Sequence, residues 1–331
     1  MIELLHHLLN LDWRRRGGTV RELEIDGSRV WFVEFQPRPL APPTLRRSLK
    51  GRVSSATRPP TAVLLHGLGD SSASFYSLIP QLRRLYRVIV PDLPGHGRSR
   101  PPAGQKFLPF PRLVEVTEKF VAQVAGRGAY LAGNSMGGWI AVKVAARRPD
   151  LVRAMALLNP GGPALRAEDW VDLARILMAE ERGAPDEWMN RVFHKAPLAV
   201  RLFKKDFHRI MRGPPVSQLV TSLQAEDFLS EAEIARVRCP ATLVWGERDR
   251  FLPDGCRAFY LKKLKGVRYE PVPDCGHCPQ LECPSRTAEI LLELPTQTVK
   301  SRRSLALGGG RVTVAPRARG GLDPVARAPR D

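Results

Sequence analysis

The sequence contains no apolar run that approaches the roughly 20 residues needed for a membrane-spanning helix. Cysteine is scarce: the chain of 331 residues has five, and all of them lie between Cys239 and Cys283. An odd, clustered set does not form a disulfide framework and favours a reducing compartment. The first residues carry Glu3 and no early basic side chain, so we expect no signal peptide there. These features predict a cytoplasmic protein.

Acidic residues are also few, 33 against 52 lysines and arginines, which gives a net charge of +19. Most of the excess lies in residues 36–60 and 298–331, each with a net charge of +6. Both segments are rich in proline, glycine, serine or arginine and poor in aromatic residues. We therefore expect a disordered insert and a disordered tail. Contact with anionic lipid is the alternative role for this charge, and binding to nucleic acid is not expected.

Three cysteines, Cys275, Cys278 and Cys283, lie beside His277, so a zinc site has to be considered. The sequence offers no second pair of ligands at the spacing of a zinc site. We expect no metal and no cofactor, and small packing roles for the cysteines.

Residues 129–147 contain the most informative pattern, a G-x-S-x-G at Gly133–Gly137. A short apolar run precedes it, and a segment of small and apolar residues follows it. This strand, tight turn and helix are the context in which the motif carries a nucleophile. Ser135 would occupy the turn in a strained conformation, and a Cβ at either flanking glycine would collide with a neighbouring strand or helix. The backbone N–H of Met136 would open the helix and point at a developing oxyanion.

The remainder of the chain alternates between strand and helix patterns, which predicts a mostly parallel sheet covered by helices on both faces. A hairpin turning at Asp26-Gly27 precedes this alternation. We expect strands at residues 20–25, 30–35, 61–65, 87–90, 130–132, 152–158, 241–245 and 267–272. We expect helices at residues 72–85, 113–125, 256–264 and 285–294.

Residues 163–237 interrupt the alternation and are helical in pattern. We interpret them as a helical cap inserted over the carboxyl edge of the sheet, where such folds keep their sites. The core is then expected at residues 20–162 and 238–297. Residues 1–19 form an N-terminal amphipathic segment, with leucines at positions 4, 5, 8 and 9. Packing on the core is expected for it, with anchoring to a membrane surface as the alternative.

An activated serine needs a base and an acid that orients the base. Asp249 follows the strand expected at 241–245, and His277 follows the strand expected at 267–272. Asp254 and Asp274 compete with Asp249, but Asp254 is expected to cap a helix, and Asp274 is too near His277 in the chain. Asn159 follows another strand but cannot supply a charge.

Five segments together resemble the α/β-hydrolase family across roughly residues 20–295: HGLGD, DLPGHGRS, GNSMGG, VWGERDRFLP and DCGHCPQLECP. The resemblance implies an α/β-hydrolase fold with a helical cap and no cofactor. It also implies roles for the matching residues: Ser135 as nucleophile, His277 as general base and Asp249 as its orienting acid. The backbone N–H groups of Leu68 and Met136 would form the oxyanion hole.

The resemblance extends to monoacylglycerol-type lipases and carboxylesterases, so we expect hydrolysis of a small-molecule ester or lipid. Hydrolases that cleave C–C bonds in ring-fission products are the alternative. They usually carry a tryptophan where this chain has Cys278, and a more glycine-rich loop than the one after His66. A non-catalytic ligand-binding member of the fold also remains open. His66 and His96 are expected to hold loops rather than to act in catalysis.

The cap contains a basic amphipathic stretch at residues 199–212. Its apolar residues at helical spacing are Ala199, Leu202, Phe203, Phe207, Ile210 and Met211. Its basic residues are Arg201, Lys204, Lys205, His208, Arg209 and Arg212, with Asp206 the single acid. The first interpretation of this stretch is an ordinary cap helix whose apolar face covers the acyl pocket. The second is peripheral contact with a membrane, because such helices also suit an anionic lipid surface.

Overall fold

The computed structural model describes residues 11–38, 59–178 and 183–305. Its centre is one sheet with strand order β1-β2-β4-β3-β5-β6-β7-β8. The strands are β1 (Gly18–Ile25), β2 (Ser28–Phe35), β3 (Thr61–Leu65), β4 (Arg87–Pro91), β5 (Ala129–Asn134), β6 (Val152–Leu158), β7 (Ala241–Gly246) and β8 (Arg268–Val272). All pairs from β4 to β8 are parallel, while β1 and β2 join the edge in antiparallel register. The predicted mostly parallel sheet is confirmed.

The first two strands form the predicted hairpin, in which Ile25 pairs with Ser28 across the turn. The turn residues Asp26 and Gly27 have φ angles of 49° and 77°. Two successive positive φ values match the twist of the flanking strands, and Asp-Gly adopts them readily. The hairpin follows from the local sequence alone.

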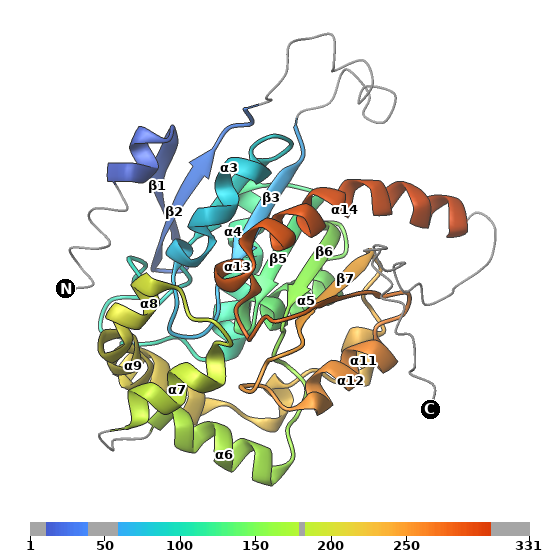
Figure 1. Ribbon diagram of the computed structural model, residues 1–331. Helices are drawn as coiled ribbons and strands as arrows, with labels where there is room; N and C mark the ends of the chain where they lie inside the picture. The colour runs from blue at the N-terminus through green and yellow to red at the C-terminus, as the bar shows by residue number, and fades with distance from the viewer. Residues whose placement is uncertain (1–10, 39–58, 179–182, 306–331) are drawn as a thin grey trace, which may run out of the picture.

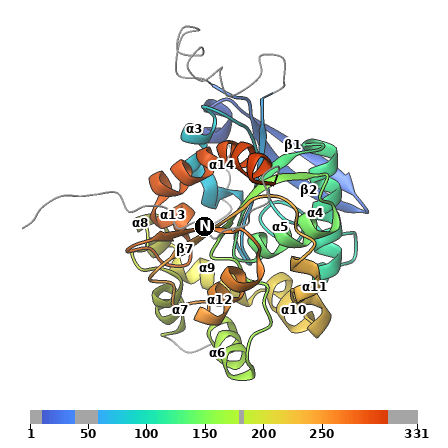
Figure 2. The ribbon, with the colours of Figure 1, turned by 90° about the vertical axis from the view of Figure 1, so that its right-hand side faces the viewer.

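Helices cover both faces of the sheet, and Figures 1 and 2 show them from two sides. One face carries a 3-10 helix (Ser72–Leu78), α3 (Ile79–Leu82), α13 (Pro279–Glu282) and α14 (Pro284–Leu305). The other face carries α4 (Phe110–Val124), α5 (Met136–Arg147) and α12 (Asp254–Lys263). Each face has its own apolar core, because strands buried on both sides present alternate side chains to two layers.

Between β6 and β7 the described chain is helical and lies to one side of the sheet, below it in Figure 1. Its helices are α6 (Ala167–Met178), α7 (Ala184–Val192), α8 (Leu198–Leu202), α9 (Lys204–Arg212), α10 (Pro214–Ser222), a 3-10 turn (Ala225–Asp227) and α11 (Glu231–Ile234). A third apolar core, built around Trp188, Val192, Met211 and Val216, holds them together. We call residues 163–237 the helical insertion.

Three elements differ from the sequence-based expectation. The helix expected over 72–85 is a 3-10 helix followed by one short α-turn, with Pro80 at its start. The stretch 199–212 is divided into α8 and α9 at Phe203, whose φ of −104° and ψ of 16° are not helical. The last helix continues to Leu305, past residue 298, where the basic tail was expected to begin. Residues 298–305 contain neither glycine nor proline, so nothing local stops the helix there.

The predictions for the leucines at positions 4–9, for most of the basic insert and for the end of the tail lie outside the described residues. Within them, Trp13 is buried and its ring lies 5.4 Å from that of Phe35 and 5.0 Å from that of Tyr76. The end of the N-terminal segment therefore packs on the domain. In the part of the chain that the structure describes, no helix combines the length and apolarity of a membrane span.

Candidate active site

Ser135 lies in the turn between β5 and α5 with φ of 52° and ψ of −117°. A non-glycine residue in this region costs about 1–3 kcal/mol, so the surroundings must hold it there. Its N–H donates to the Leu158 carbonyl at 3.0 Å, and its carbonyl accepts from the N–H groups of Trp139 and Gly161 at 3.1 Å. The serine is only partly buried, and it lies at the carboxyl end of β5.

The two glycines of the motif are sterically required, as predicted from the sequence. A Cβ on Gly133 would lie 2.3 Å from the backbone of Gly137, and one on Gly137 would lie 2.2 Å from the Leu65 carbonyl oxygen. The strand and the helix can therefore approach only because both positions lack a side chain.

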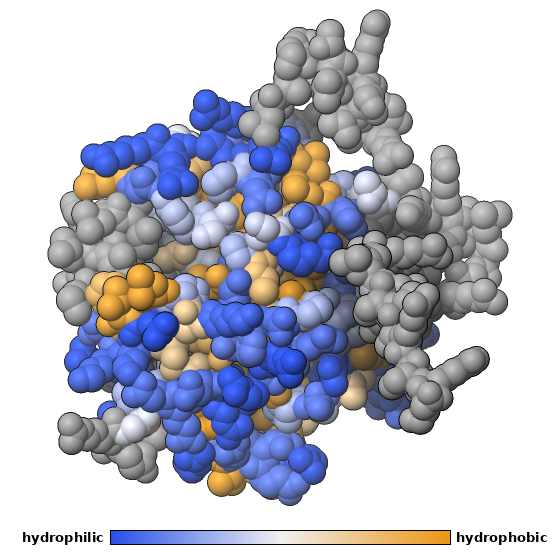
Figure 3. Space-filling view, viewed as in Figure 1, coloured by the Kyte–Doolittle hydropathy of each residue, from blue (hydrophilic) through white to orange (hydrophobic). Residues whose placement is uncertain are grey.

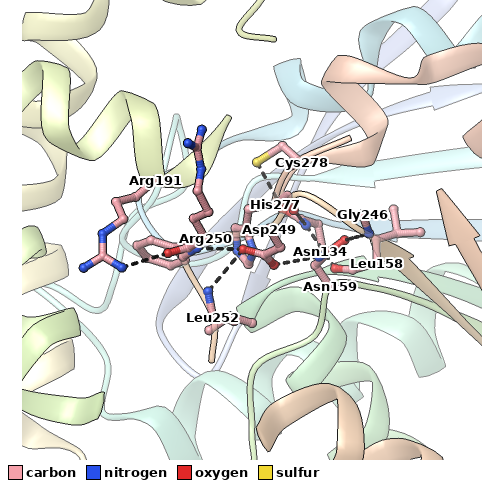
Figure 4. Close-up of polar contacts among 12 residues, drawn as sticks. Asn134, Leu158, Asn159, Arg191, Gly246, Asp249, Arg250, Leu252, His277 and Cys278 are labelled. Atoms are coloured by element: carbon pink, nitrogen blue, oxygen red, sulfur yellow. Dashed lines mark hydrogen bonds and ion pairs between the residues drawn. The ribbon is translucent and has the colours of Figure 1, made fainter. Parts of the chain in front are cut away.

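Asp249 and His277 come together from the loops after β7 and β8. Nδ1 of His277 lies 2.8 Å from Oδ2 of Asp249, and both side chains are buried. Oδ1 of Asp249 accepts from the N–H groups of Phe251 and Leu252 at 2.8 and 3.1 Å. Because a carboxylate faces Nδ1, this ring nitrogen is the donor of the pair, and Nε2 is the nitrogen turned away from Asp249. Figure 4 shows Asp249 at the centre of this network.

Asn159, which follows β6, completes the environment of the acid. Its Nδ2 donates to Oδ2 of Asp249 at 2.6 Å, and its Oδ1 accepts from the N–H of Gly246 at 3.0 Å. The sequence analysis concluded only that Asn159 cannot supply a charge. Its position directly after a strand that ends at the same sheet edge as Asp249 was the available signal for a positioning role.

Nε2 of His277 is buried and has no hydrogen-bond partner among the described residues. The residue next to the serine fixes the backbone of this histidine: Nδ2 of Asn134 donates to the His277 carbonyl at 2.9 Å and to the Leu158 carbonyl at 3.0 Å. The ends of β5, β6 and β8 are thus tied together around one buried, unpaired imidazole nitrogen. A buried base without a partner suits proton transfer with a bound molecule.

The two rival carboxylates do not approach the imidazole. The Asp274 side chain is 63% exposed and lies 3.8 Å from Arg248 and from His194. Asp254 is 85% exposed and pairs with Arg257 at the start of α12, where Pro253 rather than Asp254 is the N-cap. The capping role expected for Asp254 is therefore wrong.

His66 and His96 hold the neighbouring loops, as expected. Nδ1 of His66 donates to the Gly67 carbonyl at 2.7 Å, and Nε2 accepts from the N–H of Leu93 at 2.9 Å. Burial lowers the pKa of His66 to about 4 and that of His96 to about 3. Both rings are neutral at physiological pH, and the first fixes the loop that leads to Leu68.

That loop runs beside the serine, since a Cβ on Gly67 would lie 3.3 Å from the Cβ of Ser135. Leu68, Ser135 and Met136 line one cavity of about 90 Å³ between the sheet and the helical insertion. Its other lining residues are almost entirely apolar: Phe110, Trp139, Gly161, Gly162, Pro163, Leu165, Trp170, Leu173, Leu177, Leu219, Val220, Leu223, Phe228, Phe251, Leu252 and Cys256. Among the described residues, no charged side chain lines it.

His277 and Asp249 are not among the lining residues. Phe251 lines the cavity, and its ring lies 4.8 Å from that of His277. Ser135 also lines the cavity, and its neighbour Asn134 contacts the His277 carbonyl.

Glu282 links the histidine loop to the helical insertion, and sequence reasoning missed it. Its Oε1 accepts from the N–H of Gly276 at 3.0 Å, and its Oε2 accepts from the N–H groups of His194 and Lys195 at 2.8 Å. The N–H of His277 also donates to the Val192 carbonyl at 2.8 Å. The signal was an acidic residue five positions after the histidine, in a segment with few other charges.

Over residues 11–38, 59–178 and 183–305, no group of three or more histidine, cysteine, aspartate or glutamate residues could hold a metal ion. All five cysteines are free thiols. Burial raises the pKa of the Cys278 thiol well above its usual value, so this thiol stays protonated beside the histidine.

Comparison with known proteins agrees with this architecture. A model of the family described as "Alpha/beta hydrolase family" matches residues 62–290. A pimeloyl-[acyl-carrier protein] methyl ester esterase of Nitrosomonas europaea is 27% identical over 245 residues, which cover 69% of this chain and 92% of that protein.

Two solved structures are also similar. The crystal structure of a membrane phospholipase A, described as a bacterial virulence factor, has a TM-score of 0.73 and 25% identity, covering 90% of this chain and 92% of the other. A meta-cleavage product hydrolase from Pseudomonas fluorescens IP01 has a TM-score of 0.66 and 17% identity, covering 84% and 97%. At that identity the second likeness shows the fold alone.

Proposed function

The chain belongs to the α/β-hydrolase family, and from that premise we propose that it is a serine hydrolase that cleaves carboxylic esters through an acyl-enzyme intermediate. The observation that carries this proposal is the buried Asp249–His277 pair with Nε2 unpaired, beside a strained Ser135 at the edge of an apolar cavity. We infer that these three residues act as nucleophile, general base and orienting acid.

In this mechanism, Oγ of Ser135 attacks the ester carbonyl carbon while Nε2 of His277 takes the hydroxyl proton. The N–H groups of Leu68 and Met136 stabilise the negative charge that develops on the carbonyl oxygen. His277 then gives its proton to the leaving alcohol, and the acyl group remains on Ser135. His277 then takes a proton from a water molecule that attacks the acyl-enzyme, and it returns this proton to Oγ of Ser135 as the carboxylic acid leaves.

Asp249 acts by orientation and charge. Its three hydrogen bonds from Phe251, Leu252 and Asn159 hold the carboxylate in place, so the imidazole ring is held in one tautomer. The negative charge also stabilises the imidazolium that forms during attack.

The lining of the cavity favours an ester with an uncharged, apolar acyl chain. Burying a charge without a partner is costly, and the described residues that line the cavity include no cation. A ring-fission dienoate carries a carboxylate that would need such a partner, so C–C bond hydrolysis is the less favoured alternative. We infer that the helical insertion acts as a cap that closes this chamber from water.

A series of p-nitrophenyl esters of increasing acyl length tests the proposal, together with a ring-fission dienoate. We expect kcat/KM to rise with chain length until the cavity is filled, and no turnover of the dienoate. Ser135→Ala and His277→Ala should each remove nearly all activity, because the two residues act as one unit. A fluorophosphonate should label the wild type at Ser135.

Full esterase activity in Ser135→Ala would refute the catalytic assignment. An inactive wild type that still binds the esters would instead favour a non-catalytic ligand-binding protein.

A further inference from the structure

The largest exposed apolar side chains of the helical insertion lie on α8 and on α6. Leu198 and Leu202 are 70% and 68% exposed, and Val171 on α6 is 67% exposed. The two leucines are four residues apart on one helix, so they share one face. Figure 3 shows an orange patch over α8, bordered by hydrophilic residues.

The packing of α8 explains this exposure. Val200 is buried in the core of the insertion, so it anchors the opposite side of the helix. Leu198 and Leu202 consequently point away from the protein. The exposure of both leucines therefore follows from the way in which α8 packs on the insertion.

The sequence left two interpretations of residues 199–212 open, a lipid-facing helix and an ordinary cap helix. The apolar side of α9 is used internally: Met211 is buried, and Phe207 and Ile210 pack against the core of the insertion. The sulfur of Met211 also lies against Gly69 in the loop after β3. The apolar side of α9 therefore follows the cap-helix interpretation, and only α8 leaves apolar side chains exposed for contact with lipid.

Three basic residues lie close to the two leucines along the chain. Lys195, Arg201 and Lys205 are exposed and form no ion pair with any described residue. Lys204 and Arg209 are compensated, by Asp186 and Asp206 respectively. An exposed apolar pair with uncompensated cations on the same and adjoining segments suits the interfacial region of an anionic bilayer, where acyl chains lie below negative headgroups.

We propose that this surface, formed by Lys195, Leu198, Arg201, Leu202 and Lys205, docks the protein on anionic lipid membranes. We call it the α8 surface. Leu198 and Leu202 enter the headgroup region, and the three cations bind the lipid phosphates. Docking goes beyond the proposed ester hydrolysis and does not depend on it, because no residue of the α8 surface lines the cavity.

The test uses the full chain and co-sedimentation with vesicles of phosphatidylcholine alone or of phosphatidylcholine and phosphatidylglycerol in equal amounts. We expect binding to the mixed vesicles only, weakening as salt rises. Arg201→Gln with Lys205→Gln should lower the partition coefficient about 30-fold. Leu198→Ser with Leu202→Ser should lower it about tenfold.

Matched controls are available on the same chain. Lys262 and Lys265 are exposed and form no ion pair with any residue that the structure describes, so Lys262→Gln with Lys265→Gln removes the same charge elsewhere. Val171→Ser removes a comparably exposed apolar side chain from α6. Both controls should bind vesicles as the wild type does, and all variants should hydrolyse a dissolved short ester at the wild-type rate.

A second measurement places the leucines directly. Leu202→Trp should add fluorescence that is quenched by brominated phospholipid in mixed vesicles, and Val171→Trp should not. This quenching measurement does not depend on loss of binding, so it remains informative if a double variant folds poorly.

Several outcomes would overturn the proposal. Equal loss in the Lys262/Lys265 control would show a diffuse effect of net charge. Binding that persists in both α8 variants but is lost on deletion of residues 1–10 would place docking on that segment. A wild-type dimer that Leu198→Ser with Leu202→Ser dissociates would show a second copy on this surface. By contrast, α8 variants that lose vesicle binding and keep esterase activity would support docking and leave the function proposed above unaffected.

Discussion

Asn159 donates a hydrogen bond of 2.6 Å to the same carboxylate oxygen of Asp249 that faces Nδ1 of His277. Asn159 also accepts from the Gly246 N–H, so it fixes both the acid and the strand from which the acid extends. A neutral amide here gives Asp249 a donor without adding a second charge. The ends of β6 and β7 thus share the task of orienting one imidazole.

Replacing Asn159 tests this arrangement. Asn159→Ala removes the donor to Asp249, and we expect kcat/KM for a short ester to fall about tenfold, the value of one hydrogen bond to a charged group. Asn159→Asp places a second carboxylate beside the imidazole, which favours its protonated form. The acid limb of the pH profile of kcat/KM should then move to higher pH. An unchanged profile in Asn159→Asp would contradict a direct effect on the pair.

Glu282 should matter for turnover as well as for stability. Glu282→Gln removes one acceptor oxygen from the three N–H groups of Gly276, His194 and Lys195. We expect the free energy of unfolding to fall by about 2 kcal/mol. We also expect kcat to fall while KM for a short ester changes little, because the histidine loop loosens and the cavity does not change.

The control for this experiment is Glu289→Gln on α14, where the side chain is 60% exposed and pairs only with Arg286. It should leave kcat and the urea midpoint unchanged. If Glu282→Gln lowers stability and leaves kcat intact, the residue is a simple clamp for the insertion.

The steric role of Gly133 predicts that replacing it with alanine destabilises the protein far more than the same replacement at Gly255. Gly133→Ala would put a Cβ 2.3 Å from the backbone of Gly137, so we expect the free energy of unfolding to fall by at least about 3 kcal/mol. Gly255→Ala has no atom within 4 Å and lies in α12, so its effect should stay within about 1 kcal/mol. Urea denaturation of both variants measures the difference. Equal effects would mean that α5 can move away from β5.

We expect the free energy of unfolding to decrease in acid because of His66. Burial lowers its pKa to about 4 from an ordinary 6.5, so the folded state prefers the neutral ring. Its contribution to stability is present above about pH 6.5 and is lost as the pH falls towards 4. Below that range we expect a loss of about 3 kcal/mol relative to neutral pH. The difference in unfolding free energy between the wild type and His66→Asn should shrink across this range.

A difference between the wild type and His66→Asn that does not depend on pH would show that the ring is not held neutral.

The sequence by itself determined the order of strands and helices, the Asp-Gly hairpin and the strained turn at Ser135. These features depend on residues that are close in the chain: periodicity sets each element, and the absence of side chains at Gly133 and Gly137 allows the turn. The positions of Asp249 and His277 were also predictable, because parallel strands end at one edge of a sheet.

Only the tertiary structure decided which groups meet across that edge. Asn159 lies 90 residues from Asp249, and Asn134 lies 143 residues from His277, so no local pattern encodes these hydrogen bonds. The same holds for residues 199–212, whose apolar side chains look alike in sequence. Packing buried Met211 and left Leu202 exposed, because the core of the insertion has one inner side and the chain breaks its helix at Phe203. Periodicity predicts that a face is apolar, and only the packing of the neighbouring helices decides what covers it.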